Sequence, residues 1–202
     1  MNPGPTFDRV YLALKEQLTS GRFAPGDHLE PAALGEELSA SITPVRDALH
    51  RLVGERIVEA PRHDGFRVPA PLEAELRELY GWNRQLLELA LRCAGTRSAA
   101  PAIGEADGAA TATADLFRRM ARMAGNAEHE QAIDNLSDRL GALRIAEARI
   151  FDDSEEELAA MRGALEVGDL AALRRQIAAY HRRRQRFVPE ILAAARKGCE
   201  PR

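Results

Sequence analysis

The sequence predicts a mostly α-helical fold that joins an N-terminal winged helix-turn-helix, with a small two-stranded wing, to a C-terminal antiparallel helical bundle. Three observations support this prediction. Apolar residues recur at helical spacing along most of the 202 residues. A short segment between residues 56 and 70 instead combines β-branched residues with turn residues. Pro69 and Pro71 separate the two patterns, so we expect domains at residues 1–70 and 71–202.

The first 40 residues contain two predicted helices. From residue 6 to residue 20 the apolar residues are three or four positions apart, and Gly21 ends this pattern. The sequence Pro25-Gly26-Asp27 is typical of a turn, and it precedes a short extended piece that contains Leu29. A second, shorter helix is expected over residues 31–38.

Residues 41–52, SITPVRDALHRL, predict a third helix with one apolar face and an exposed polar start. Its apolar face is formed by Ala48, Leu49, Leu52 and Val53. Thr43, followed by Pro44, is expected to cap this helix. Only residues 39–41 separate it from the preceding helix, which predicts a helix-turn-helix. In proteins that read DNA, the second helix of this motif lies in the major groove.

The next segment, RIVEAPRHDGFRVPA, predicts the wing as a two-stranded hairpin. Ile57 and Val58 are β-branched and are assigned to its first strand. The turn is expected at His63-Asp64-Gly65, and Phe66 and Val68 belong to the second strand because they alternate with a charged residue.

Beyond Pro71 the pattern predicts helices only. We expect them over residues 72–94, 114–124, 128–151, 154–167 and 170–195. The intervening stretch 96–113 is rich in Ala, Gly, Ser and Thr and is interpreted as a loop or an eroded helix. Helix boundaries are indicated at Gly125-Asn126, Asp152-Asp153-Ser154 and Gly168-Asp169.

Composition limits the class of protein. The formal net charge is −3 and the pI is about 6.0, so any binding to nucleic acid must depend on a local basic cluster. Cys93 and Cys199 are far apart in sequence, which fits neither a metal-binding motif nor a disulfide framework. No stretch approaches the roughly 18 apolar residues of a membrane span, and the start does not have the pattern of a signal peptide. We therefore expect a soluble protein of the reducing cytoplasm.

Three segments together resemble the GntR family of bacterial winged-helix regulators. They are PGDHLEPAALGEEL, SITPVRDALHRL and RHDGFRV, and the resemblance covers roughly residues 8–70. The second half is similar to the FCD-type effector domain of the FadR branch, through NRQLLE (83–88), MAGN (123–126) and ALEVGD (164–169). The resemblance implies a homodimer that binds a double-stranded DNA operator and responds to a small organic acid.

The chain departs from this family in two places. Ile42 stands where the family usually has an arginine that grips the operator. The family's effector domain often binds a divalent metal through an Asp-x-x-x-His pair and two further histidines. The alignment places Ala114, Arg118, Leu158 and Tyr180 at those positions. These side chains cannot supply imidazoles and carboxylates, so we expect no bound metal and no other cofactor. The helical domain also looks short, so its ligand cavity is expected to be small, open or missing.

The candidate DNA-binding residues lie on the third helix and on the wing. On the helix they are Ser41, Thr43, Arg46, His50 and Arg51, and on the wing they are Arg62, His63, Gly65 and Arg67. The arginine at position 46 is placed to pair with guanine or phosphate, and the alternative is a surface arginine paired with Glu37 or Asp47. The hydroxyls can cap the helix and bind phosphate at once. For His50 and Arg51 a solvated face is an equal alternative.

The candidate effector residues are Arg84, Glu88, Tyr180 and His181, which are polar residues on otherwise apolar helix faces. The alternative is structural hydrogen bonding within the bundle. The run of arginines from residue 182 to residue 186 is interpreted as a solvated or ion-paired face rather than a second nucleic-acid site. Tyr80 and Trp82 are expected to pack between domains or subunits.

Two functions are consistent with these observations, and both involve sequence-specific DNA binding. The first is a ligand-responsive repressor that acts as a homodimer on a pseudo-palindromic operator. The second is a regulator whose degenerate effector domain has no small-molecule ligand and is constitutive or controlled by a protein. An enzyme is not indicated, because the sequence has no nucleophile–histidine arrangement, no phosphate-binding glycine loop and no metal-ligand set.

Overall fold

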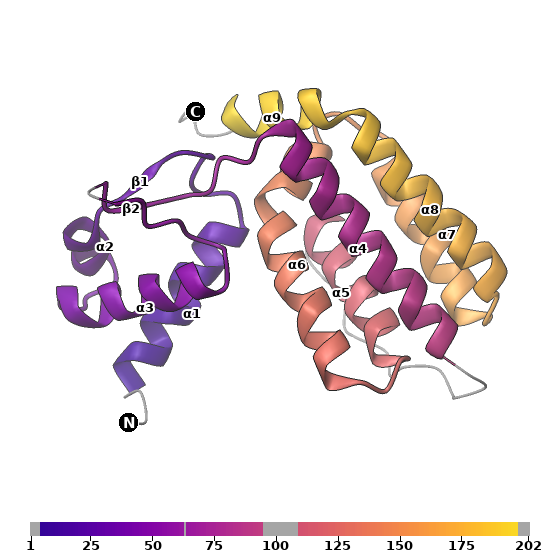
Figure 1. Cartoon of the computed structure of the whole chain (residues 1–202), viewed down its shortest axis with the longest axis horizontal. Coiled ribbons are helices and arrows are strands. Elements are labelled where there is room, and N and C mark those ends of the chain that lie inside the picture. Colours follow the sequence, from indigo (N-terminus) through magenta and orange to yellow (C-terminus); the bar gives the residue numbers. More distant parts are fainter. Residues whose placement is uncertain (1–4, 63, 95–108, 198–202) are drawn as a thin grey trace.

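The computed structural model describes residues 5–62, 64–94 and 109–197. Two groups of elements lie side by side, and the segment between β2 and α4 connects them (Figure 1). The first group comprises α1 (Pro5–Thr19), β1 (His28–Leu29), α2 (Pro31–Glu37), α3 (Ile42–Gly54) and β2 (Phe66–Arg67). The second comprises α4 (Glu73–Cys93), α5 (Ala109–Arg122), α6 (Ala127–Glu147), α7 (Ser154–Glu166), α8 (Leu170–Arg186) and α9 (Val188–Lys197). The mostly helical fold with a small antiparallel sheet is confirmed.

The apolar stripe predicted for the third helix faces the core of the first group. Ala48, Leu49 and Leu52 of the predicted stripe are buried against α1, β1 and β2 together with Val45, whereas Val53 is only partly buried. Ser41 is the N-cap residue of α3, so the predicted cap at Thr43 is two residues too late. Pro44 still lies in the first turn, where its missing N–H leaves no hydrogen bond unmade.

The wing differs from the predicted hairpin. β2 pairs antiparallel with β1, in the register His28↔Arg67 and Leu29↔Phe66, and the segment after α3 contributes only one bridge, Glu59↔Arg67. The reason lies at the end of α3, where the N–H groups of Ile57 and Val58 both donate to the carbonyl of Leu52. These two residues therefore close the helix and cannot form a ladder with β2.

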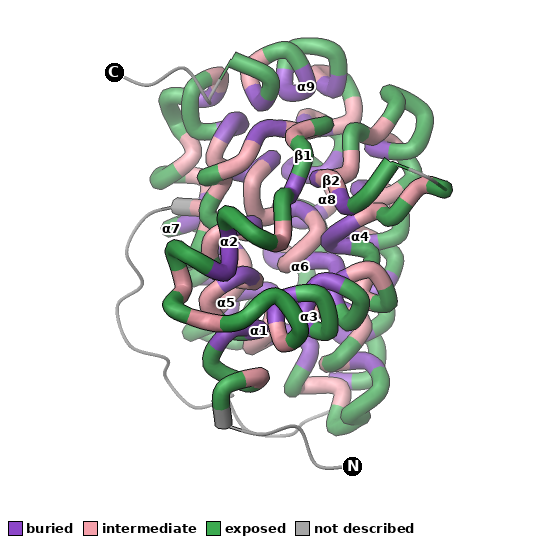
Figure 2. Tube along the Cα trace, turned by 90° about the vertical axis from the view of Figure 1, so that its left-hand side faces the viewer, coloured by how far each residue is buried: buried purple, intermediate pink, exposed green. Residues whose placement is uncertain are grey.

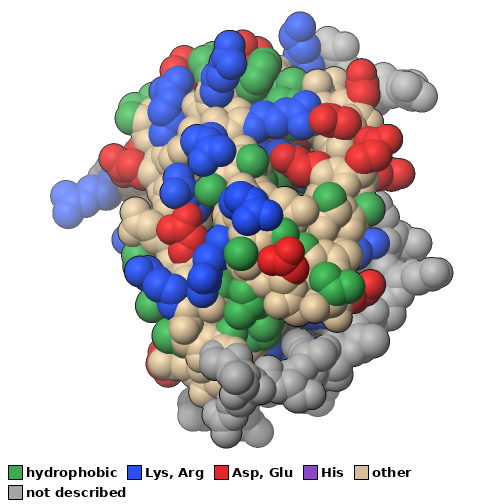
Figure 3. Space-filling view, turned by 90° about the vertical axis from the view of Figure 1, so that its right-hand side faces the viewer, with side chains coloured by type: hydrophobic (Ala, Val, Ile, Leu, Met, Phe, Trp, Pro, Cys, Tyr) green, Lys and Arg blue, Asp and Glu red, His purple; other side chains and the backbone are tan. Residues whose placement is uncertain are grey.

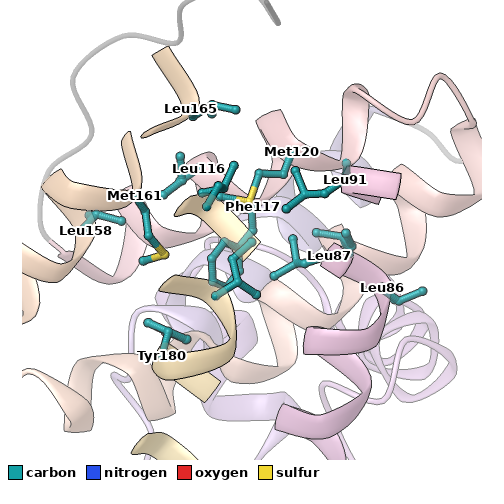
Figure 4. Close-up of a cluster of buried hydrophobic side chains, with 14 of the residues drawn as sticks. Leu86, Leu87, Leu91, Leu116, Phe117, Met120, Leu158, Met161, Leu165 and Tyr180 are labelled. Carbon is teal, nitrogen blue, oxygen red and sulfur yellow. The ribbon is translucent and has the colours of Figure 1, made fainter. Parts of the chain in front are cut away.

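The second group is a six-helix bundle over the residues that the structure describes, with α4 packed against α5, α6 and α8. One apolar core lies among α4, α5, α7 and α8, and Figure 4 shows Phe117 and Met120 of α5 beside Leu87 and Leu91 of α4. A second core, which includes Leu76 of α4, lies under α9. Within the described ranges, no helix is long and apolar enough to cross a membrane.

Two predicted boundaries in the bundle are wrong. The helix expected over 170–195 is interrupted at Phe187, which separates α8 from α9. Pro189 accounts for this break, because proline cannot donate to the carbonyl of residue 185 and its ring clashes there. The fifth helix begins at Ala109 rather than at residue 114, and the rest of the stretch predicted as a loop lies outside the described residues.

The two groups touch where the C-terminal end of α1 meets α6. Nζ of Lys15 lies 2.6 Å from a carboxylate oxygen of Asp138, and the Asn135 amide donates to the carbonyl of Glu55 at 2.8 Å. Gly141 lies in this contact: a Cβ built on it would be 2.7 Å from O of Thr19 and 3.2 Å from its Cα. Only a residue without a side chain allows α1 and α6 to approach so closely.

Gly141→Ala is therefore expected to lower the free energy of unfolding by about 1–3 kcal/mol, because the added methyl group collides with backbone atoms. Gly163→Ala in α7 is the matched control, since a Cβ there meets nothing within 4 Å. That control should be more stable than the wild type by about 0.5–1 kcal/mol through helix propensity alone. Urea denaturation measures both. Equal stabilisation by the two substitutions would contradict the α1–α6 contact.

Candidate nucleic-acid interface

The start of α3 is exposed to solvent. Viewed from the side of the first group, α3 crosses in front of the other elements, turned away from the bundle (Figure 2). Ser41, Thr43 and Arg46 are exposed on this surface, and Ile42 is 50% exposed among them. The first turn of a helix presents unpaired N–H groups and a positive dipole end, which favour phosphate.

Arg46 is not held by another part of the described chain. It makes no ion pair or hydrogen bond with any residue that the structure places, and Asp47 beside it is also exposed. The alternative partner Glu37 binds Arg22 instead, with Nη2 of Arg22 2.7 Å from Oε2 of Glu37. The guanidinium of Arg46 therefore keeps all of its donors for an external acceptor.

The other two candidate residues of α3 make contacts within the protein. The guanidinium of Arg51 lies 4.0 Å from the ring centroid of Tyr11 and 3.4 Å from a carboxylate oxygen of Glu55. The charge of Arg51 is thus partly compensated by contacts within the protein. The ring of His50 packs edge-on against Phe66 of β2, with a centroid separation of 4.9 Å. His50 therefore links the exposed face of α3 to the wing.

On the wing, the three described candidates differ in their surroundings. Arg62 is exposed and makes no ion pair with a described residue. The Nε of Arg67 lies 3.0 Å from Glu59, and its Nη1 lies 3.7 Å from Asp64. Gly65 has a φ of +66° with open space around it, so its conformation requires glycine. The fourth candidate, His63, lies outside the described residues.

One residue that positions this surface was not predicted. Nη1 of Arg9 in α1 donates to the carbonyl of Leu38 at 2.9 Å, at the C-terminal end of α2. The following residue, Ser39, has a φ of 49°. Arg9 therefore braces the tight turn between α2 and α3, because it satisfies a carbonyl that the helix leaves unpaired.

The four candidate effector residues do not share one cavity. Arg84 and Glu88 form an ion pair of 2.6 Å along α4, with side chains about one-third exposed (35% and 31%). Tyr180 and His181 are buried in the bundle, where the ring nitrogens of His181 lie 2.8 Å from O of Ile177 and 2.9 Å from Oδ1 of Asn83. The geometry of the last two fits structural hydrogen bonding.

His181 provides a test of this burial through the pH dependence of stability. Burial, reinforced by the charges of Arg144 and Arg184, lowers the pKa of His181 to about 3. In the unfolded chain histidine has a pKa near 6.5, so below that pH the unfolded state binds a proton that the folded state does not. The stability that the neutral ring contributes is present above pH 6.5, and it is lost as the pH falls towards 3.

Between pH 7 and pH 5, His181 is expected to contribute a loss of about 2 kcal/mol in the free energy of unfolding. His181→Gln should reduce the measured pH dependence by that amount. Urea denaturation of both proteins at the two pH values measures the difference. The contribution of carboxylate titration to the pH dependence cancels in the comparison, because both proteins contain the same carboxylates. Identical pH dependence in the variant would show that His181 is accessible to protons in the folded state.

A buried ionic network occupies the space between α4, α6 and α8. The carboxylate of Glu147 accepts hydrogen bonds from Tyr80 at 2.5 Å, from Arg184 at 2.9 Å and from Tyr180 at 3.3 Å. Nη1 of Arg184 also contacts Glu157 at 2.5 Å. Burial and the charge of Glu147 raise the pKa of Tyr80 well above its ordinary value, so Tyr80 remains a donor. The prediction that Tyr80 packs between domains or subunits is wrong, since it is fully buried in the bundle.

Arg144 lies beside this network and differs from Arg184. It is 3% exposed, and all three of its guanidinium nitrogens are without an acceptor among the residues described. The guanidinium carbon of Arg144 lies 5.2 Å from the ring centroid of Phe117. The cavity next to it has a volume of about 10 Å³, which is close to the space of one water molecule.

The residues aligned with the family's metal ligands lie in different surroundings. Arg118 is about one-third exposed and pairs with Asp115 and Asp134, whereas Leu158 and Tyr180 face the bundle interior. Phe117, one position earlier than Arg118, lies in that interior. Over the described ranges, no group of three or more His, Cys, Asp or Glu residues is placed to hold a metal ion.

The arginine run of α8 is distributed around the helix. Arg183 forms a bidentate pair with Asp153, at 2.7 and 2.8 Å, while Arg184 is buried. Figure 3 shows the side of the molecule formed by α7 and α8, where Lys and Arg side chains lie among Asp and Glu side chains. This face is therefore a mixed charged surface rather than a uniform basic patch.

The fold and the exposed start of α3 place this chain in the class of winged helix-turn-helix proteins with an attached helical bundle. Residues 6–68 match the family described as "Bacterial regulatory proteins, gntR family". The chain is 33% identical over 70 residues to the HTH-type transcriptional repressor GlaR of Escherichia coli K12, covering 35% of this chain and 32% of that protein. It is 41% identical over 78 residues to the HTH-type transcriptional regulator McbR of E. coli K12, covering 39% and 34%.

Two solved structures have the same fold over nearly the whole chain. E. coli McbR/YncC matches with a TM-score of 0.69 and 21% identity, covering 93% of this chain and 98% of that one. A GntR-type protein of Rhodococcus sp. RHA1 matches with a TM-score of 0.72 and 19% identity, covering 91% and 97%. Residues 6–68 therefore match the GntR family of bacterial regulatory proteins, and the chain as a whole has the fold of these two structures. Its sequence matches span only about a third of the curated relatives, which are named as regulators and not as enzymes.

Proposed function

We propose that this protein is a sequence-specific DNA-binding transcriptional regulator, with a winged helix-turn-helix domain at residues 1–70 and a helical effector and dimerisation domain at residues 71–202. The regulator acts as a homodimer on a pseudo-palindromic operator, and repression is its default action. In this arrangement the two α3 helices of the dimer enter the major groove in adjacent half-sites.

The observation that supports this proposal most strongly is the exposed, unpaired guanidinium of Arg46 on the outer face of α3. A free guanidinium one turn into a recognition helix can donate two parallel hydrogen bonds to guanine. Ser41 and Thr43 lie at the start of the same helix, where hydroxyl and backbone N–H groups can bind phosphate. The wing adds Arg62 beside them.

The net charge of residues 1–70 limits how strongly this surface can bind DNA without sequence specificity. Residues 1–70 contain eight Lys and Arg against ten Asp and Glu, so the domain has a charge of −2. Indiscriminate binding to the DNA backbone should therefore be weak, and specific contacts must supply most of the affinity.

DNA binding is tested by fluorescence anisotropy with a labelled duplex from the region upstream of the protein's own gene, titrated at several salt concentrations. We expect a saturable curve with nanomolar affinity that falls as salt rises, and at least about 10³-fold weaker binding to a scrambled duplex of equal length. Equal affinity for both duplexes would overturn sequence-specific regulation.

A second candidate function keeps DNA binding but has no ligand in the bundle. It is favoured by the cavity beside the Glu147 network, whose volume is only about 10 Å³. Such a regulator would be constitutive or controlled by another protein. Thermal shift against a panel of carboxylates separates the two candidates: a saturable rise in Tm with one acid, together with weakened DNA binding, excludes the second.

A further inference from the structure

A cavity lies between the two domains, where the winged helix-turn-helix meets the bundle. Its volume is about 770 Å³, which is within the range that small-molecule sites occupy. The winged helix-turn-helix contributes Val53, Arg56 and Val58 to its wall, and the linker contributes Pro69 and Pro71. The bundle contributes Leu79 and Trp82 of α4 and Arg139 of α6. We call this cavity the interdomain cleft.

Apolar surface in the interdomain cleft is left open to solvent. Trp82 is the single tryptophan of the chain and is 50% exposed, although it lies in a hollow. Leu79 beside it is only partly buried, and Val53 lies at the opposite wall. A large exposed aromatic ring in a concave site is a common feature of binding sites, because its burial by a ligand is favourable.

The cleft also contains two guanidinium groups without partners. Neither Arg56 nor Arg139 makes a hydrogen bond or ion pair with any residue in the described ranges. Arg56 and Arg139 line the same cleft, and burial together with repulsion from the positive charge of Arg56 lowers the pKa of Arg139. An anion between them would remove this repulsion and accept hydrogen bonds from both.

The carboxylates of the cleft do not already perform this role. Glu59 pairs with Arg67 at 3.0 Å, Asp138 pairs with Lys15 at 2.6 Å, and Glu75 accepts the backbone N–H of Leu72 at 2.7 Å. Glu78 is the remaining carboxylate, and it has no partner among the placed residues. None of these four carboxylates therefore pairs with Arg56 or Arg139, whose N–H donors stay open to a ligand.

We propose that the interdomain cleft is the effector site, and that it binds a small monocarboxylate with an apolar body, the carboxylate between Arg56 and Arg139 and the apolar part against Trp82. This inference rests on the proposed function for its regulatory meaning. It places the ligand away from the filled interior of the bundle, at the contact between the two domains.

A ligand in this position would act directly on the recognition helix. Arg56 lies two residues beyond the end of α3, in the segment whose N–H groups cap that helix through the carbonyls of Leu52 and Val53. Arg56 has a left-handed φ of 59°, which fixes this segment in an uncommon conformation. A carboxylate that bridges Arg56 and Arg139 would connect the end of α3 to α6 and restrain the angle between the domains.

The fluorescence of Trp82 can report ligand binding in the cleft. Octanoate and phenylacetate are titrated into the full-length protein while Trp82 fluorescence is recorded, with octanamide and phenylacetamide as neutral controls of the same shape. We expect a saturable change with at least one acid and at least about tenfold weaker binding of its amide, because the amide forfeits the charge-assisted hydrogen bonds. No saturable response to either acid, or equal affinity for acid and amide, would overturn the proposal.

Variants locate the binding site. Arg139→Gln, and Arg56→Asn, which tolerates the left-handed backbone, should each weaken binding of the acid by about tenfold. Arg182→Gln is the matched control, since Arg182 is exposed on α8 and remote from the cleft. Thermal unfolding and calorimetric titration of each variant separate lost binding from lost folding. Unchanged affinity in a folded Arg139→Gln protein would exclude the cleft.

The ligand site and the proposed DNA function can fail independently. Acid binding is measured on the protein alone, and DNA binding is measured first without acid. The regulatory role is then tested by adding the acid at saturation to the DNA titration, where we expect a change in affinity of at least about fivefold, typical of allosteric coupling. An acid that binds in the cleft but leaves DNA affinity unchanged would overturn the regulatory role.

Discussion

Glu147→Gln is expected to lower the free energy of unfolding by about 3–5 kcal/mol, the range found when one partner of a buried ion pair is removed. Glu147 is 3% exposed and is the only carboxylate within the described chain that both tyrosines and Arg184 contact in the bundle. Glutamine keeps the shape of the side chain but removes its charge. Arg184 would then retain only Glu157, which is nearer the surface.

Arg144 makes this loss larger than a single broken hydrogen bond would suggest. Its guanidinium is buried without an acceptor among the described residues, and it lines the same small cavity as Glu147. Without Glu147, two arginines share one buried region with one partly exposed carboxylate, and a buried cation without compensation is costly. Tyr80 would also lose the charged acceptor of its hydroxyl.

Urea denaturation at pH 7, followed by circular dichroism, measures this effect. Glu166→Gln is the control, because Glu166 is exposed at the end of α7 and makes no ion pair within the described ranges; its effect should stay within about 0.5 kcal/mol. If Glu147→Gln cost less than about 1 kcal/mol, the network would have to be hydrated, and the filled interior of the bundle would lose its support.

The elements that were predictable from sequence are those whose formation depends on local pattern. The stripe of Ala48, Leu49, Leu52 and Val53 predicts α3 because a period of 3.6 residues places them on one face, and the first three are buried in the structure. The caps at Asn126 and Asp169 were likewise predicted, and both side chains accept backbone N–H groups of the following turn. Such signals involve neighbours in sequence, so no knowledge of tertiary structure is needed.

The errors occur at helix ends, where the backbone groups have more than one possible partner. Ile57 and Val58 have the composition of a strand, but the carbonyl of Leu52 takes their N–H groups and leaves β1 as the partner of β2. The break before Pro189 had a local signal, the proline itself, which the apolar spacing on both sides concealed.

The polar sites show the same division. Exposure of Arg46 follows from its place opposite the apolar stripe, whereas burial of Glu147, Arg144 and Arg184 cannot be inferred from helical spacing, which treats charged residues as surface. The interdomain cleft could not be predicted from the sequence either. Arg56 and Arg139 are 83 positions apart, and only the docking of α1 on α6 brings them to the same cavity.

Arg46→Ala is expected to weaken operator binding by about 1–3 kcal/mol, which is a loss of about 5- to 150-fold, while leaving Tm nearly unchanged. The two expectations follow from one observation: the side chain is exposed and makes no contact with the rest of the described chain that folding could lose. Arg182→Ala on α8 is the control for the removal of one positive charge, and it should leave operator affinity within about twofold.

Salt dependence distinguishes the two ways in which Arg46 can contact DNA. If the guanidinium binds a base, the variant should lose discrimination between the operator and a single-base substitution at one position, with little change in the slope of log K against log salt. If it binds a phosphate, affinity should fall for every sequence and the slope should decrease by about one. Operator affinity equal to that of the wild type, with Tm also unchanged, would exclude Arg46 from the interface and with it the proposed orientation of α3.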